Sequence, residues 1–172
     1  MKLRELEMKD VPLMLEWMHD PSVVENLRTD FMSKTIEDCE RFILTSNDDQ
    51  SINLAIVDET DQYQGTVSLR DIEGGAAEFA ITVRASAMGK GYSKWAMDEI
   101  MRKGFDELGL TLIYWCVSPD NKRAIRFYDK NGFKRVSSDQ IEDYVKDSGY
   151  TTEQVHTYVW YAINRYMRLL EN

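Results

Sequence analysis

The chain has 172 residues, of which 43% are hydrophobic and 30% are charged. This length and balance are typical of one globular domain, which we place at residues 1–172, and they exclude an intrinsically disordered chain. The net charge of −9 argues against a nucleic-acid-binding protein, since such proteins present a basic face to phosphates.

The two cysteines, Cys39 and Cys116, lie far apart and match no metal-binding or redox spacing. We therefore expect reduced thiols, no bound metal and a cytoplasmic location. The first seven residues lack the apolar core of a signal peptide, and no later run approaches the length of a membrane span. No membrane partner is expected.

The first part of the chain is predicted to be mainly helical. A short strand over 2–7 precedes a helix in which Val11, Met14 and Met18 recur on one face. That helix ends before Pro21, because the residue preceding a proline avoids the helical region. A second helix is expected to begin at Thr35, a favourable N-cap residue.

The middle of the chain changes from a helical to a strand-like period. Residues 51–57 and 63–69 predict two antiparallel strands around a polar turn, and Gly74-Gly75 leads into a third strand over 76–83. A loop with two glycines and a long amphipathic helix ending near Gly109 follow. Free N–H groups and the dipole at such a helix start suit an anion such as phosphate.

The last part of the chain begins with an almost wholly apolar run, Thr111 to Val117. This composition favours a strand buried on both faces and compatible with a parallel neighbour. The other predicted elements are a helix over 121–130, a strand over 133–136, a short helix or long loop over 138–150, a strand over 154–162 and a helix over 164–170.

Two motifs lie on either side of the apolar run. One is Met88-Gly89-Lys90-Gly91-Tyr92-Ser93, and the other is formed by Asn121, Ala124, Tyr128, Gly132 and Phe133. Together they resemble the GNAT superfamily of acyl-CoA-dependent N-acyltransferases, with its Arg/Gln-x-x-Gly-x-Gly/Ala loop and its Asn-x-x-Ala-x-x-x-Tyr-x-x-x-Gly-Phe helix. Met88 replaces the usual Arg or Gln, and Ser93 replaces the final Gly or Ala.

The resemblance implies an α/β (α+β) fold. Its central sheet would be mixed but mainly antiparallel, with about six or seven strands flanked by helices. The sheet would be splayed between the strand before the glycine loop and the next strand. The resemblance also implies acetyl-CoA as co-substrate, bound by Ile81, Thr82, Val83, Met88, Gly89, Lys90, Gly91, Tyr92, Ser93 and Asn121.

Tyr128 and Glu78 are the catalytic candidates. By resemblance Tyr128 is the general acid, because a phenol is protonated at neutral pH and can protonate a leaving thiolate. Its alternative is an ordinary core aromatic. Glu78 is the candidate base, acting through a water, with a solvent-facing strand residue as its alternative. Cys116 stands where some family members carry a glutamate base, so that route is closed.

The acceptor is less well specified. Trp17-Met18-His19-Asp20-Pro21 looks like a turn of the RimJ/RimL-like branch, which acetylates protein N-termini. We favour, narrowly, a small-molecule primary amine such as an amino sugar, attacked directly in a ternary complex. A peptide N-terminus and a non-catalytic CoA-binding domain are the alternatives. The sequence does not decide whether the protein forms a homodimer.

Several side chains are candidates for shaping the acceptor site. His19 or His156 could line it, although a lone histidine is more often structural. Acidic residues could surround a cationic amine or form a solvated surface; they are Glu16, Asp20, Glu25, Asp30, Asp139, Glu142 and Asp143. Three aromatics, Trp17, Tyr144 and Trp160, could stack on a ring.

Overall fold

The computed structural model describes residues 1–146 and 148–166. Within these residues, seven strands form one sheet in the order β1-β2-β3-β4-β5-β7-β6. The strands are β1 (Lys2–Glu5), β2 (Ile52–Val57), β3 (Tyr63–Glu73), β4 (Ala76–Val83), β5 (Leu112–Val117), β6 (Arg135–Val136) and β7 (Val159–Asn164). Neighbouring strands are antiparallel except β4 and β5, which are parallel. The predicted mixed, mainly antiparallel sheet is confirmed.

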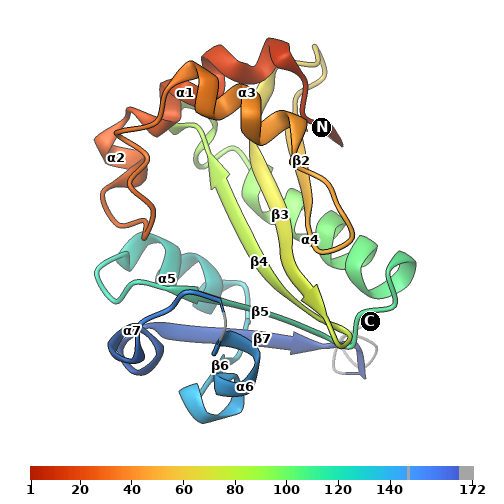
Figure 1. Cartoon of the computed structure of the whole chain (residues 1–172), viewed down its shortest axis with the longest axis vertical. Coiled ribbons are helices and arrows are strands. Elements are labelled where there is room, and N and C mark those ends of the chain that lie inside the picture. The colour runs from red at the N-terminus through yellow and green to blue at the C-terminus, as the bar shows by residue number, and fades with distance from the viewer. Residues whose placement is uncertain (147, 167–172) are drawn as a thin grey trace.

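Strands β4 and β5 diverge after a short ladder. They pair only where Ala76–Glu78 lies beside Leu112–Tyr114. The next residue on each strand is a large aromatic, and the rings of Phe79 and Trp115 meet edge to face at 5.5 Å. In Figure 1, β3 and β4 separate from β5 and β7 like the two arms of a V. The predicted splay is therefore present, and among the described strands none pairs with the β5 side of β4 from Phe79 to Val83.

Helices cover both faces of the sheet. They are α1 (Val11–Met18), α2 (Pro21–Val24), α3 (Ile36–Leu44), α4 (Tyr92–Arg102), α5 (Lys122–Lys130), α6 (Glu142–Val145) and α7 (Thr152–Thr157). Because side chains alternate along a strand, Trp115 packs on the face of α4 and α5, whereas Tyr114 packs on the other face, against α6 and α7. On that second face, Ala55 and Val57 pack against α1 and α3. Among the described helices, none has the length and apolar character needed to cross a membrane.

Local signals place the helix starts in the first half of the chain. Thr35 caps α3 as predicted, accepting a hydrogen bond from the N–H of Asp38 at 3.3 Å, while the Asp38 carboxylate accepts from the N–H of Thr35 at 3.0 Å. Helix α1 ends at Met18, and Asp20 caps the short helix α2, which the sequence analysis did not predict.

The predicted strand over 154–162 is wrong in its first half. Residues 152–157 form α7, and β7 begins only at Val159. The helix start has a physical cause, because Thr151 and Gln154 form a capping box. The predicted helix over 164–170 starts too early, since Asn164 still belongs to β7, and residues 167–170 lie outside the described part of the chain.

Candidate active site

A groove of about 200 Å³ runs from the glycine loop to the splay; we call it the loop groove. Seven of the predicted cofactor residues line it: Ile81, Thr82, Val83, Met88, Gly89, Ser93 and Asn121. The other three are outside this lining: Lys90 and Gly91 lie in the glycine loop, and Tyr92 is the first residue of α4. The structure therefore gathers around one space residues that are 40 positions apart in sequence.

The glycine loop has the backbone that an anion site requires. Gly89 and Gly91 have φ values of 74° and 88°, which side chains other than glycine rarely adopt. Gly91 is the N-cap of α4, and the backbone ladder of the helix starts with Trp95 N–H donating to the Gly91 carbonyl at 3.1 Å. The first N–H groups of the helix are thus left for another acceptor.

Arg123 provides a charge near the loop that sequence analysis missed. It lies on α5 and lines the loop groove, and its Nη1 is 2.9 Å from the sulfur of Met88. Met88 stands where the family loop usually carries Arg or Gln. Arg123, from α5, therefore brings a positive charge next to Met88, whose own side chain is uncharged.

A second space, of about 180 Å³, lies between the diverging ends of β4 and β5; we call it the central pocket. Residues 26–29 and Phe31, from the segment after α2, form part of its wall, as do Tyr150 and Tyr158. The central pocket and the loop groove share several lining residues: Leu27, Ile81, Thr82, Asn121, Ala124 and Tyr128. The two spaces therefore meet at the splay.

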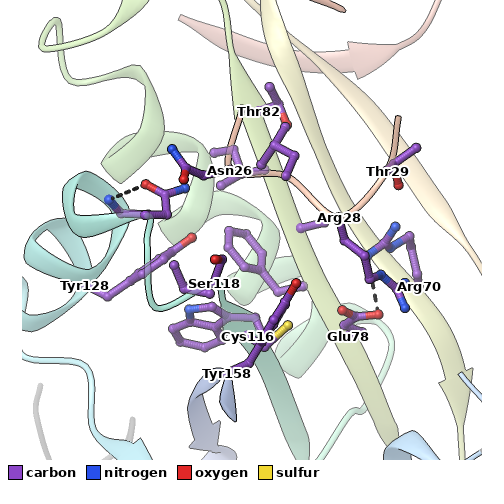
Figure 2. Close-up of a pocket in the computed structure, with 18 of the residues that line it drawn as sticks. Asn26, Arg28, Thr29, Arg70, Glu78, Thr82, Cys116, Ser118, Tyr128 and Tyr158 are labelled. Atoms are coloured by element: carbon purple, nitrogen blue, oxygen red, sulfur yellow. Dashed lines mark hydrogen bonds and ion pairs between the residues drawn. The ribbon is translucent and has the colours of Figure 1, made fainter. Parts of the chain in front are cut away.

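Tyr128 lies at this junction. Its side chain is 6% exposed and its ring lies 5.2 Å from those of both Trp115 and Tyr161, so it belongs to the aromatic core. In Figure 2 its hydroxyl points into the pocket. Burial raises the pKa of this phenol well above its ordinary value, which keeps it protonated at neutral pH. The ring of Tyr128 is therefore part of the core, and its hydroxyl faces the pocket.

Glu78 is buried, with 4% of its surface exposed, so the solvent-facing interpretation is wrong. Tyr150 donates a hydrogen bond of 2.5 Å to its Oε1, and Nη2 of Arg70 lies 3.3 Å from its Oε2. Figure 2 shows Glu78 and Arg70 on the opposite side of the pocket from Tyr128. The carboxylate therefore accepts one hydrogen bond and takes part in one ion pair within the protein.

Cys116 lies beside the same tyrosine. Its thiol donates to the Tyr150 hydroxyl at 3.2 Å. Burial raises the pKa of Cys116 to about 12, so the thiol stays neutral at pH 7 and is a poor nucleophile.

The two histidines are both exposed and line neither the loop groove nor the central pocket. His19 Nε2 lies 2.8 Å from the Lys34 carbonyl, and His156 Nδ1 lies 3.4 Å from the Ser138 hydroxyl. The structure therefore agrees with the alternative that these histidines are structural or exposed. Among the described residues, no three His, Cys, Asp or Glu side chains are grouped as a metal site would require.

The acidic candidates fit the alternative of a solvated surface better than an acceptor site. None of these seven carboxylates, all within the described residues, lines the loop groove or the central pocket. Glu16 instead pairs with Arg84 at 2.9 Å, and Asp20 caps α2. The charged residues that do line the central pocket are Arg28, Arg70 and Glu78.

Of the three aromatic candidates, only Trp17 lines a pocket beside the central pocket. It lines a more apolar pocket of about 290 Å³ between β3, β4, α1 and α3, which shares Phe31 and Arg70 with the central pocket. Tyr144 and Trp160 line neither space, and Tyr150 and Tyr158 lie at the central pocket in their place. Trp160 is excluded because it is buried beneath α7, with its N–H bonded to the Val155 carbonyl.

Comparison with known proteins agrees with this geometry. The model of the family described as "Acetyltransferase (GNAT) domain" matches residues 1–134. The chain belongs to the GNAT acetyltransferase family. As a GNAT member, it is an N-acetyltransferase, and a solved N-acetyltransferase shares its fold. The RimJ/RimL-like assignment stays a prediction.

Named relatives of this GNAT chain are distant. It is 24% identical over 136 residues to "Acetyltransferase PseH" of Campylobacter jejuni, covering 79% of this chain and 84% of that protein. It is 28% identical over 153 residues to "Uncharacterized N-acetyltransferase p20" of Bacillus licheniformis, covering 86% and 85%. Among solved structures, spermidine N-acetyltransferase from Vibrio cholerae in complex with CoA and spermine has a TM-score of 0.78 and 19% identity, covering 98% of this chain and 97% of that one.

Proposed function

We propose that this enzyme transfers the acetyl group of acetyl-CoA to a primary amine by direct attack within a ternary complex. The main support is that Tyr128 borders both the loop groove and the central pocket. A side chain at this junction faces both substrates when each occupies its own space. When bound, acetyl-CoA supplies the acetyl group as a thioester, so the reaction needs a neutral amine and a proton for the leaving thiolate.

The residues of the loop groove fit the chemical groups of CoA. The free N–H groups at the start of α4 and the guanidinium of Arg123 suit a pyrophosphate. The unpaired edge of β4 offers backbone groups from Ile81 to Val83 to an extended pantetheine chain. Asn121 Oδ1 caps α5 by accepting from the N–H of Ala124 at 3.1 Å, which leaves its amide NH₂ for the ligand.

In this proposal Tyr128 holds the proton that the leaving sulfur requires. Glu78 accepts, through a water, the proton that the attacking amine loses. The neutral state of the Cys116 thiol favours direct attack over an acetyl-cysteine intermediate, because a thiol must be ionised to compete as a nucleophile.

For the acceptor, we favour a small-molecule primary amine over a peptide N-terminus. The central pocket is walled by the segment after α2 and by Tyr150 and Tyr158, which limits the space beyond the junction. The Vibrio cholerae structure of the same fold, in complex with CoA and spermine, gives a precedent for a small amine.

The decisive experiment measures free thiol released from acetyl-CoA with amino sugars, aminoglycosides, polyamines and short peptides. Intersecting lines in a two-substrate analysis are expected, since a ternary complex is proposed, whereas parallel lines would indicate an acetyl-enzyme. CoA binding without release of thiol with any amine would favour a non-catalytic CoA-binding domain. Activity with peptides alone would favour N-terminal acetylation.

A further inference from the structure

The central pocket has an excess of positive charge, although the whole chain has a net charge of −9. Its charged lining residues are two arginines, Arg28 and Arg70, and one glutamate, Glu78. Figure 2 shows the two guanidinium groups on the same side of the pocket as the Glu78 carboxylate. A ligand that brings only positive charge would meet net repulsion there.

The single carboxylate is not free to compensate both arginines. Its Oε1 accepts from Tyr150 and its Oε2 faces Arg70 at 3.3 Å. Arg70 Nε is buried and has no hydrogen-bond partner among the described residues. Because a buried donor without a partner is costly, this N–H favours a ligand acceptor or a water at the same place.

Arg28 is held in place without a carboxylate partner. Its guanidinium carbon lies 3.9 Å above the centre of the Tyr150 ring, a cation–π arrangement. Within residues 1–146 and 148–166, no carboxylate lies within ion-pair distance of Arg28. The ring fixes the position of the guanidinium and leaves its in-plane N–H groups available, a geometry suited to an oxyanion.

We propose that the acceptor is an amine that also carries an anionic oxygen group, a carboxylate or a phosphate, bound by Arg28 and Arg70. This inference rests on the proposed function, because it names the class of amine that enters the central pocket. The anionic group is held at the arginine side, and the amine lies between Glu78 and Tyr128, which face each other across the pocket (Figure 2). A polyamine lacks the anionic group and is disfavoured.

The test uses two pairs of amines whose members differ in one anionic group. Glucosamine 6-phosphate is compared with glucosamine, and β-alanine is compared with its amide, with spermidine as the polycation. In at least one pair, the amine with the oxyanion is expected to have a kcat/KM about 10- to 100-fold above its partner without it, mainly through KM. The pair that shows this preference identifies the oxyanion as phosphate or carboxylate.

Arg28→Gln should remove the preference, and Arg28→Lys should keep part of it, because lysine retains the charge but not the planar fork. Arg41→Gln is the matched control, since the Arg41 side chain is 71% exposed and lies outside both spaces. Added salt should reduce the preference of the wild-type protein, because Arg28 is exposed at the pocket.

Calorimetric titration of the CoA-loaded protein with the same pairs separates this inference from the proposed function. Tighter binding of an anionic member, lost in Arg28→Gln, supports the inference even if no amine is acetylated. Equal binding and equal kcat/KM within both pairs would overturn it while leaving acetyl transfer intact. Preference for spermidine, or binding of no member of either pair, would overturn it as well.

Discussion

The Tyr150 hydroxyl donates a hydrogen bond of 2.5 Å to the Glu78 carboxylate across 72 residues of sequence. It links the segment between α6 and α7 to the point where β4 leaves β5. The same tyrosine accepts from Cys116 and lies beneath Arg28. Tyr150 therefore joins the candidate base to the proposed anion-binding arginine.

Removing this hydroxyl tests whether Glu78 needs its partner. Tyr150→Phe should lower kcat/KM for the amine by about tenfold, the effect of losing one hydrogen bond to a charged group, with little change in acetyl-CoA affinity. Steady-state kinetics with each substrate varied in turn measures this. Tyr144→Phe is the control, because Tyr144 is 47% exposed and outside the central pocket. Unchanged kcat/KM in Tyr150→Phe would separate the hydrogen bond from catalysis.

Tyr128→Phe tests the general acid. The variant keeps the ring that packs on Trp115 and loses only the hydroxyl, so the fold should be preserved. We expect kcat to fall about 10²- to 10⁴-fold while acetyl-CoA binding stays nearly unchanged. Because the pKa of Tyr128 is raised, the phenol should stay protonated up to pH 10. Its ionisation should therefore cause no fall in kcat below that pH. A variant with full kcat removes Tyr128 from the mechanism, and a large rise in Kd makes it a binding residue.

The glycine loop should depend on backbone shape more than on side-chain charge. Gly91 has a φ of 88°, and a Cβ added there would meet no other atom within 4 Å, so the cost of Gly91→Val comes from the backbone itself. Lys90 is exposed, so Lys90→Ala should cost under about 1 kcal/mol of CoA binding. Calorimetry with CoA, on variants shown to be folded by circular dichroism, compares the two. Equal losses would indicate a side-chain clamp in place of the backbone.

Acid should weaken a charge cluster around Asp61. Hydrogen bonds from Lys9, then Lys2 and Arg4, lower the pKa of Asp61 below its ordinary 3.8. Because the folded pKa is the lower one, this stabilisation is complete above about pH 5 and is lost as the pH falls through 3.8 toward the folded value. Asp61→Asn should therefore lower the urea midpoint at pH 7 by more than at pH 3.

Asp71→Asn is the matched control for that experiment. Asp71 also has a positive φ, of 51° against 67° for Asp61, and no cation among the described residues pairs with it. Its substitution should leave the urea midpoint almost unchanged at both pH values. If pH changed the urea midpoints of Asp61→Asn and Asp71→Asn equally, the charge cluster around Asp61 would not contribute to stability.

Local sequence determined much of this protein. The positive φ values of Gly89 and Gly91, the cap at Thr35 and the apolar strand over 112–117 depend on residues close in the chain, and pattern and propensity predict such features. The overall strand order and the splay came from the resemblance of two motifs. Where a local signal was overlooked, as in the capping box at Thr151, the prediction of a strand was wrong.

Only the tertiary structure decided the character of the central pocket. Glu78 could have faced solvent or the interior, and its burial depends on Arg70 from β3 and Tyr150 from the segment before α7. Spacing in the sequence carries no signal for such contacts, because they form when distant elements pack. The acidic composition allowed a cationic partner, whereas packing placed the acidic candidates elsewhere and brought Arg28 and Arg70 to the pocket. The net charge of a chain is a sum over its whole surface, and the field inside one pocket depends on the few groups that line it.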